Sequence, residues 1–108
     1  MARAQLLQFI YTLEPVRPEV VTDPNVWTEK DEQTFQRHWA YLSKATEEGI
    51  VILAGRAQDG QGPAICVFEA KSEAEARTFM ESDPFVAEGF ARARLHPFRV
   101  ALQRKQKI

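Results

Sequence analysis

Two residues of this sequence, His38 and Asp83, have side chains suited to acid–base chemistry. A carboxylate beside an imidazole fixes one tautomer and leaves the other ring nitrogen to exchange protons. The other histidine, His96, precedes a proline and has no comparable setting. Each candidate also has a plainer interpretation, because helix surfaces carry ordinary histidines and an Asp before Pro84 is a common helix cap.

Two arginines and several aromatic residues are candidates for binding a substrate. Arg17 and Arg56 could hold an anion, since a guanidinium pairs bidentately with a carboxylate, although most loop arginines are simply solvated. Aromatic residues at strand and helix positions are more often core than pocket. The pocket candidates among them are Tyr11, Trp39, Phe68 and Phe85.

Cofactor and metal sites are not expected. Cys66 is the one cysteine and lies in an apolar run, which excludes a disulfide framework and a cysteine-rich metal site. The two histidines belong to separate predicted elements, so they give no spacing typical of metal or haem ligands. The chain also shows no phosphate-binding glycine loop.

Length and composition predict one domain over residues 1–108, with a core at about 5–103 and a frayed tail at 104–108. Apolar residues make up 44% of the chain and charged residues 27%, a balance typical of a folded globule. The formal charge of −1 gives no positive field for nucleic acid. Without a signal peptide or a membrane-spanning segment, we expect a cytoplasmic protein.

The candidate residues are positioned by a predicted β-α-β-β-α-β order. Alternation predicts a strand at residues 5–13, and three prolines make the stretch up to residue 27 a long loop. Two apolar runs separated by turn residues predict an antiparallel hairpin, at 50–54 and 64–68. A last strand is expected from residue 90 to 102, with a bend near 96–97 where the inward parity changes.

Both predicted helices have start and stop signals. Thr28 with Asp31 resembles a capping box, and Gly49 ends the helix that follows. Ser72 with Glu75 opens a second helix that ends near residue 82, before the short turn begun by Asp83-Pro84. The apolar stripe predicted for the first helix contains Phe35, His38, Trp39, Leu42 and Ala45.

This order predicts an α+β fold in which both helices cover one face of a four-stranded antiparallel sheet. The two hairpin strands are apolar on both sides, so the opposite face would expose a contiguous apolar surface. We therefore expect a homodimer in which a second copy covers that face.

The ordered motifs resemble the YciI-like (YCII-related) family over residues 9–98. The resemblance rests on four motifs in chain order: His38-x-x-Tyr41-Leu42, Gly49-x-x-x-x-Ala54-Gly55, Ser72-x-x-Glu75-Ala76 and Asp83-Pro84-Phe85-x-x-x-Gly89. It implies a ferredoxin-like dimeric α/β barrel, with two sheets packed face to face, and a His-Asp site formed by His38 and Asp83. Many relatives have Gly-Pro where this chain has Gly55-Arg56.

Two functions remain open from the sequence. The first is a cofactor-independent enzyme, of lyase, dehydrochlorinase or isomerase type, that uses His38 and Asp83 on a small anionic or aromatic metabolite. The second is a non-catalytic dimer that binds or senses a small molecule.

An RNA-recognition domain is not favoured, because the apolar run around Cys66 does not match its aromatic motif. An acylphosphatase-like phosphate cradle would need a glycine near Arg17, where the chain has prolines.

Overall fold

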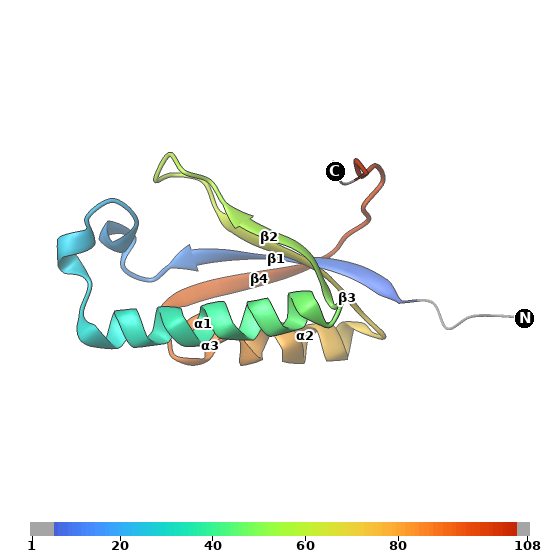
Figure 1. Cartoon of the computed structure of the whole chain (residues 1–108), viewed down its shortest axis with the longest axis horizontal. Coiled ribbons are helices and arrows are strands. Elements are labelled where there is room, and N and C mark those ends of the chain that lie inside the picture. Colours follow the sequence, from blue (N-terminus) through green and yellow to red (C-terminus); the bar gives the residue numbers. More distant parts are fainter. Residues whose placement is uncertain (1–5, 106–108) are drawn as a thin grey trace, which may run out of the picture.

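A four-stranded antiparallel sheet with the strand order β2-β3-β1-β4 organises the chain (Figure 1). The structure is a computed structural model that describes residues 6–105. Its elements, in chain order, are β1 (Leu7–Pro15), the 3-10 turns η1 (Pro18–Val21) and η2 (Pro24–Val26), α1 (Glu29–Glu47), β2 (Val51–Arg56), β3 (Ala64–Ala70), α2 (Glu73–Ser82), α3 (Pro84–Ala87) and β4 (Ala91–Pro97). The predicted α+β ferredoxin-like order is confirmed.

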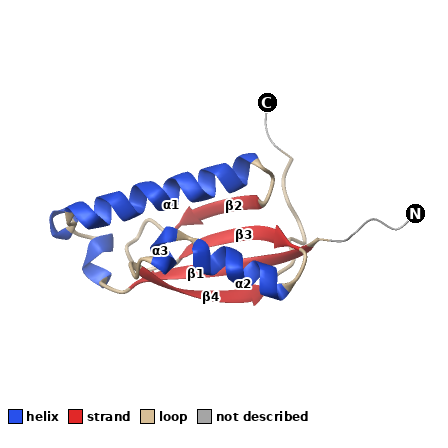
Figure 2. Cartoon of the chain, turned by 90° about the horizontal axis from the view of Figure 1, so that it is seen from below, coloured by secondary structure: helices blue, strands red, loops and turns tan. Residues whose placement is uncertain are grey.

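The helices lie together on one face of the sheet. Figure 1 shows α1 and α2 below the strands, and Figure 2, which views the chain from below, shows α2 in front of the strands and α1 along the β2 edge of the sheet. The long loop between β1 and α1 projects at one end, where η1 and η2 fold against each other (Figure 1). The opposite face of the sheet has no helix over it among residues 6–105.

The helix boundaries follow from capping. Thr28 accepts a hydrogen bond from the backbone of Asp31, whose side chain accepts one from the backbone of Thr28, so the predicted capping box is confirmed. Gly49 has a φ of 80°, a left-handed conformation that side chains disfavour, and it directs the chain from α1 into β2. Ser72 caps α2 as predicted, through the backbone of Glu75.

The side chains on the helix-covered face of β1 form the centre of the hydrophobic core. Phe9, Tyr11 and Leu13 are buried beneath the helices, and their neighbours across β3 are Phe68, Cys66 and Ala64. Tyr11 and Phe68 meet edge to face at a centroid distance of 5.7 Å. The alternation predicted for β1 is confirmed over the described residues, although Gln5, at the predicted start, lies outside them.

Two sequence predictions about packing are wrong. β4 ends at Pro97, short of the predicted end at residue 102, and Leu102 is 95% exposed. Trp39, predicted to lie on the buried stripe of α1, is 65% exposed. The helix periodicity predicted the direction of the stripe but overestimated its width, since Ala45 is buried whereas Phe35 and Trp39 are exposed. Of the predicted tail, residues 106–108 lie outside the described part.

No helix among residues 6–105 combines the length and the apolar character needed to cross a membrane.

Candidate active site

Asp83 occupies the junction between α2 and α3 and is fully buried. It caps α3, because its Oδ1 accepts a hydrogen bond from the backbone N–H of Phe85 at 2.9 Å. Pro84 stands at the first helical position, where its missing N–H costs no hydrogen bond. The Asp-Pro sequence therefore fixes a carboxylate against the inner face of the sheet.

His38, near the middle of α1, reaches this carboxylate from the neighbouring helix. Its Nδ1 lies 2.7 Å from Oδ1 of Asp83, and 12% of its side chain is exposed. The imidazole is stacked on the ring of Phe85, with centroids 3.8 Å apart and planes inclined by 7°. One hydrogen bond and one stacked ring thus hold the imidazole in a single orientation.

The hydrogen bonds decide which nitrogen of His38 is free. An ionised carboxylate only accepts hydrogen bonds, so Nδ1 carries the proton that is donated to Asp83. Nε2 bonds to no described residue, while every buried side-chain nitrogen or oxygen in residues 6–105 has a partner. Nε2 therefore reaches solvent with a lone pair that can accept a proton.

Tyr11 completes the arrangement from the sheet. Its hydroxyl donates to Oδ2 of Asp83 at 2.7 Å, on the side of the carboxylate away from His38. Burial, with Cys66 and Asp83 nearby, raises the pKa of Tyr11 well above its usual value, so the phenol stays protonated and acts as a donor. The sequence interpretation of Tyr11 as a pocket residue missed this contact. The sequence did contain a signal for this contact: Tyr11 was predicted to face inward from a strand, and a buried tyrosine hydroxyl needs a hydrogen-bond partner.

A surface ion pair holds α1 against the turn that carries Phe85. Arg37 donates to both carboxylate oxygens of Glu88, at 2.7 and 2.5 Å, and the buried Thr34 hydroxyl donates to the same carboxylate at 2.8 Å. The Arg37 and Thr34 hydrogen bonds lower the pKa of Glu88 to about 2. Thr34 lies one turn of α1 before His38 and Arg37 directly precedes it, so these contacts help to hold the imidazole beside Asp83.

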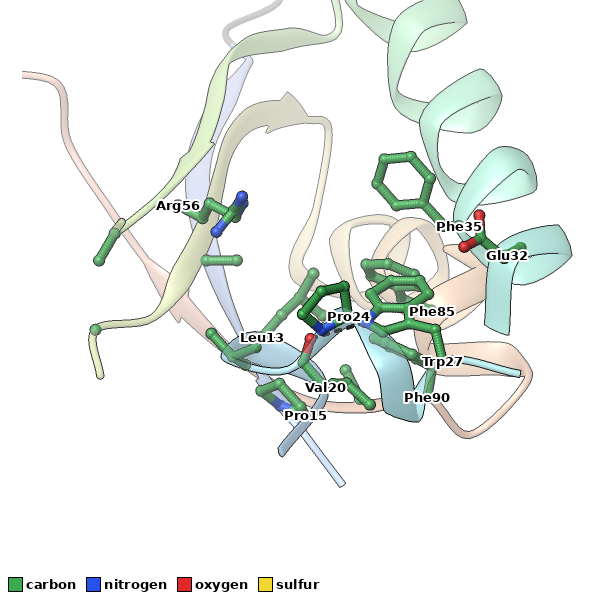
Figure 3. A pocket seen from close by; sticks show the side chains of 15 residues that line it. Leu13, Pro15, Val20, Pro24, Trp27, Glu32, Phe35, Arg56, Phe85 and Phe90 are labelled. Atoms are coloured by element: carbon green, nitrogen blue, oxygen red, sulfur yellow. Dashed lines mark hydrogen bonds between the residues drawn. The ribbon is translucent and has the colours of Figure 1, made fainter. Parts of the chain in front are cut away.

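A cavity of about 400 Å³ lies beside this arrangement. It is bounded by the helix-covered face of the sheet, by η1 and η2, and by the first turns of α1 and α3 (Figure 3). Phe85 is common to both places, since it lines the cavity and also stacks on His38. His38 itself is not among the residues that line the cavity.

The structure places Arg17, Arg56, Tyr11 and Phe85, four of the six binding candidates named from the sequence, in different surroundings. Phe85 and Arg56 line the cavity. Tyr11 does not, because it is fully buried against Asp83. Arg17 does not line it either, and its guanidinium makes two hydrogen bonds to Asp31, at 3.0 and 2.9 Å, and one to the carbonyl of Val26. Arg17 thereby fastens the long loop to the start of α1.

Comparison with known proteins assigns the family. The model of the YCII-related domain matches residues 10–99, which is most of the chain. The chain belongs to the YCII-related family. No curated protein matches the sequence of this YCII-related protein.

A solved structure shares the fold. It is 5-chloro-2-hydroxyhydroquinone dehydrochlorinase (TftG) from Burkholderia phenoliruptrix AC1100, in complex with 2,5-dihydroxybenzoquinone. The TM-score is 0.62 at 19% sequence identity, over 86% of this chain and 94% of the other. At this identity the likeness shows the fold that the YCII-related protein shares with the dehydrochlorinase.

Metal ligands do not cluster in the described part of the chain. Among residues 6–105, no group of three or more His, Cys, Asp and Glu side chains is arranged to hold an ion.

Proposed function

We propose that this YCII-related protein is a cofactor-independent enzyme that moves a proton on a small anionic or aromatic metabolite. The reaction would be of lyase, dehydrochlorinase or isomerase type, with Nε2 of His38 as the general base or acid and Asp83 as the residue that orients the imidazole. General acid–base catalysis of this kind contributes typically ~10²–10⁴-fold to a rate.

One observation carries this proposal. The carboxylate of Asp83 is fully buried and receives donors from three directions, which are the Tyr11 hydroxyl, the Phe85 backbone and Nδ1 of His38. A helix cap requires only the backbone bond, so capping alone does not explain the other two. The same bonds leave Nε2 of His38 open to solvent, and the Phe85 ring on which the imidazole is stacked also lines the apolar cavity.

The shared fold suggests what to assay first. The structural neighbour is named for the removal of HCl from a chlorinated hydroxyquinol and was solved with a dihydroxybenzoquinone. In such an elimination a base accepts the proton as chloride leaves, a role that Nε2 of His38 could fill. We therefore propose substituted hydroxyquinols and hydroxyquinones as trial substrates for this chain.

The test measures proton transfer directly. The purified protein is incubated in D₂O with 5-chloro-2-hydroxyhydroquinone or 2,5-dihydroxybenzoquinone, and deuterium incorporation and chloride release are followed by NMR and ion chromatography. We expect His38→Ala to lower either rate by about 10²-fold or more, and Asp83→Asn to lower it as well. His96→Ala is the matched control, because His96 is exposed on β4. A His38→Ala protein as fast as the unmodified one would refute the proposal.

A non-catalytic binding module is the second candidate. It is favoured by one specific observation, namely that the cavity wall does not include His38. In that case ligands would bind equally well to the unmodified protein and to His38→Ala, and neither would exchange protons or release chloride. The same experiment therefore separates the two functions.

We also propose a homodimer formed through the sheet face that has no helix over it. Register places Ile10, Val67 and Leu53 in one row across this face, and Leu53 is 47% exposed. Ile65 adds a further apolar side chain beside them. An apolar face of this kind is a usual interface between copies of a chain.

A further inference from the structure

The cavity beside Phe85 has an aromatic wall and a charged rim. Figure 3 shows the aromatic side chains gathered on one side and Arg56 across the space from them. The residues that matter below are Trp27, Phe35, Phe85 and Phe90 of the wall, with Arg56 and Glu32 as the charged side chains of the lining. Its volume of about 400 Å³ falls in the usual range for small-molecule sites.

The wall is a row of rings in contact. Phe85 and Phe90 are stacked with centroids 4.4 Å apart and planes inclined by 18°, and Trp27 continues the row 5.3 Å from Phe90. The other side of Phe85 carries the imidazole of His38. Because His38 and Phe90 cover the two faces of Phe85, a flat ring in the cavity would meet Phe85 at its edge, an arrangement that aromatic pairs favour.

Arg56 supplies the charge at the rim. It is the last residue of β2 and pairs with Ala64 of β3, which places it on the helix-covered side of the sheet. Figure 3 shows its guanidinium directed into the space between β2 and the aromatic wall. Among residues 6–105, no hydrogen bond or ion pair engages the guanidinium of Arg56, in contrast to those of Arg17 and Arg37. Its planar set of donors is therefore available to a ligand.

We propose that the cavity binds a planar aromatic carboxylate, with the ring against the edges of the aromatic wall and the carboxylate on Arg56. A guanidinium pairs bidentately with a carboxylate, and the apolar wall offers a surface that the uncharged ring can cover. This inference rests on the proposed function, since it names the substrate class of the same site.

Glu32 sets the orientation of such a ligand. Its carboxylate lies on the α1 side of the cavity, beside Phe35 and across from Arg56 (Figure 3). An anionic group placed there would be repelled, so the carboxylate of the ligand is directed to the β2 side. Replacing Glu32 by Gln should leave binding of an anionic ring unchanged or make it tighter.

The experiment measures binding of benzoate and of its uncharged analogue benzamide to the full chain. Titration calorimetry gives both affinities, and quenching of Trp27 fluorescence in a Trp39→Phe background reports on the wall itself. We expect benzoate to bind more tightly than benzamide, and Arg56→Gln to weaken benzoate by about tenfold or more while benzamide changes little. The matched control is Arg92→Gln, because Arg92 is an exposed arginine of β4 that does not line the cavity.

The outcomes separate this inference from the proposed function. Equal affinity for benzoate and benzamide, no benzoate binding at millimolar concentration, or an Arg56→Gln protein that binds benzoate as the unmodified one does would each overturn it. If His38→Ala abolishes proton exchange while Arg56→Gln leaves benzoate affinity unchanged, the function stands and the inference fails. If Arg56 governs benzoate affinity and His38→Ala has no effect on any turnover, the inference stands and the function fails.

Discussion

The hydroxyl of Tyr11 donates a hydrogen bond of 2.7 Å to Oδ2 of Asp83, 72 residues away in the sequence. This contact ties the middle of the sheet to the α2–α3 junction, and both groups are completely buried. Since Oδ1 serves His38 and the backbone of Phe85, Tyr11 is the described donor to the other oxygen. The phenol thus fixes the rotation of the carboxylate that holds the imidazole.

Tyr11→Phe should therefore destabilise the fold and disturb the imidazole. Removing the hydroxyl leaves Oδ2 of Asp83 buried without a donor, which costs about 1–3 kcal/mol of unfolding free energy. Urea unfolding measures this loss, and ¹⁵N NMR shows whether the His38 ring keeps its proton on Nδ1. The control is Tyr41→Phe, because the hydroxyl of Tyr41 donates to the backbone carbonyl of Phe79 and not to a carboxylate. Equal losses in the two variants would contradict a special role for Tyr11.

Much of the fold follows from short-range signals in the sequence. The Thr28–Asp31 capping box and the left-handed Gly49 mark the ends of α1, and both work through local backbone geometry. The end of β4 was not predictable in this way. Residues 98–102 continue an alternating pattern, but a strand persists only where a neighbour pairs with it, and after Pro97 one backbone bond, from Phe98 to Gln8, remains.

The candidate site was less accessible from sequence, because its contacts join distant segments. The resemblance to relatives supplied His38 and Asp83 as a pair, whereas local signals gave only a helix histidine and a cap. Tyr11 and Arg17 were predicted to bind substrate, but their partners, Asp83 and Asp31, lie 72 and 14 residues away. The residue type determines which groups a side chain can bind, but only the fold determines which of those groups lies within hydrogen-bonding distance.

The pairing of Arg17 with Asp31 predicts a loss of stability in acid. The Arg17 and Thr28 hydrogen bonds lower the pKa of Asp31 to about 2, below its usual value near 3.8. Because the folded state binds the proton less tightly than the unfolded state, this pair stabilises the fold above about pH 4, and the contribution is lost as the pH falls towards 2. We expect Asp31→Asn to cost about 1–2 kcal/mol at pH 7 and progressively less below pH 4.

Arg17→Gln, combined with Asp31→Asn, completes a double-mutant cycle for this ion pair. Urea unfolding of the unmodified protein, both single variants and the double variant, at intervals from pH 7 to pH 2, gives the coupling energy at each pH. The coupling should decline over the acidic range. A coupling that stays constant from pH 7 to pH 2, or that is zero throughout, would contradict the ion pair.

The thiol of Cys66 should be unreactive in the folded protein. Burial raises its pKa to about 12, and its neighbour across the sheet is Tyr11, so the thiolate that attacks reagents is scarce and enclosed. With Ellman's reagent at pH 8 we expect reaction on the order of 10²-fold slower than in denaturant. A Ser82→Cys variant adds an exposed thiol and should show one fast and one slow equivalent. Rapid labelling of Cys66 in the folded chain would contradict this burial.

Leu53→Lys should separate the proposed dimer into monomers. Leu53 lies on the sheet face without helices, in the same row as Ile10 and Val67, and it is already 47% exposed in the single chain. The substitution should therefore change the stability of one chain by only about 0.5 kcal/mol. In a face-to-face dimer each introduced ammonium group would be removed from water without a partner, at a cost of several kcal/mol.

Light scattering coupled to gel filtration, at tens of micromolar protein, measures the molar mass and so distinguishes a dimer from a monomer. We expect the unmodified chain to elute as a dimer and Leu53→Lys as a folded monomer with an unchanged circular dichroism spectrum. Trp39→Lys is the control, since it replaces an even more exposed apolar residue on α1, in the opposite layer of the molecule. If that variant also dissociated, or if Leu53→Lys remained dimeric, the sheet face would not be the interface, and the apolar row across β1, β2 and β3 would need another occupant.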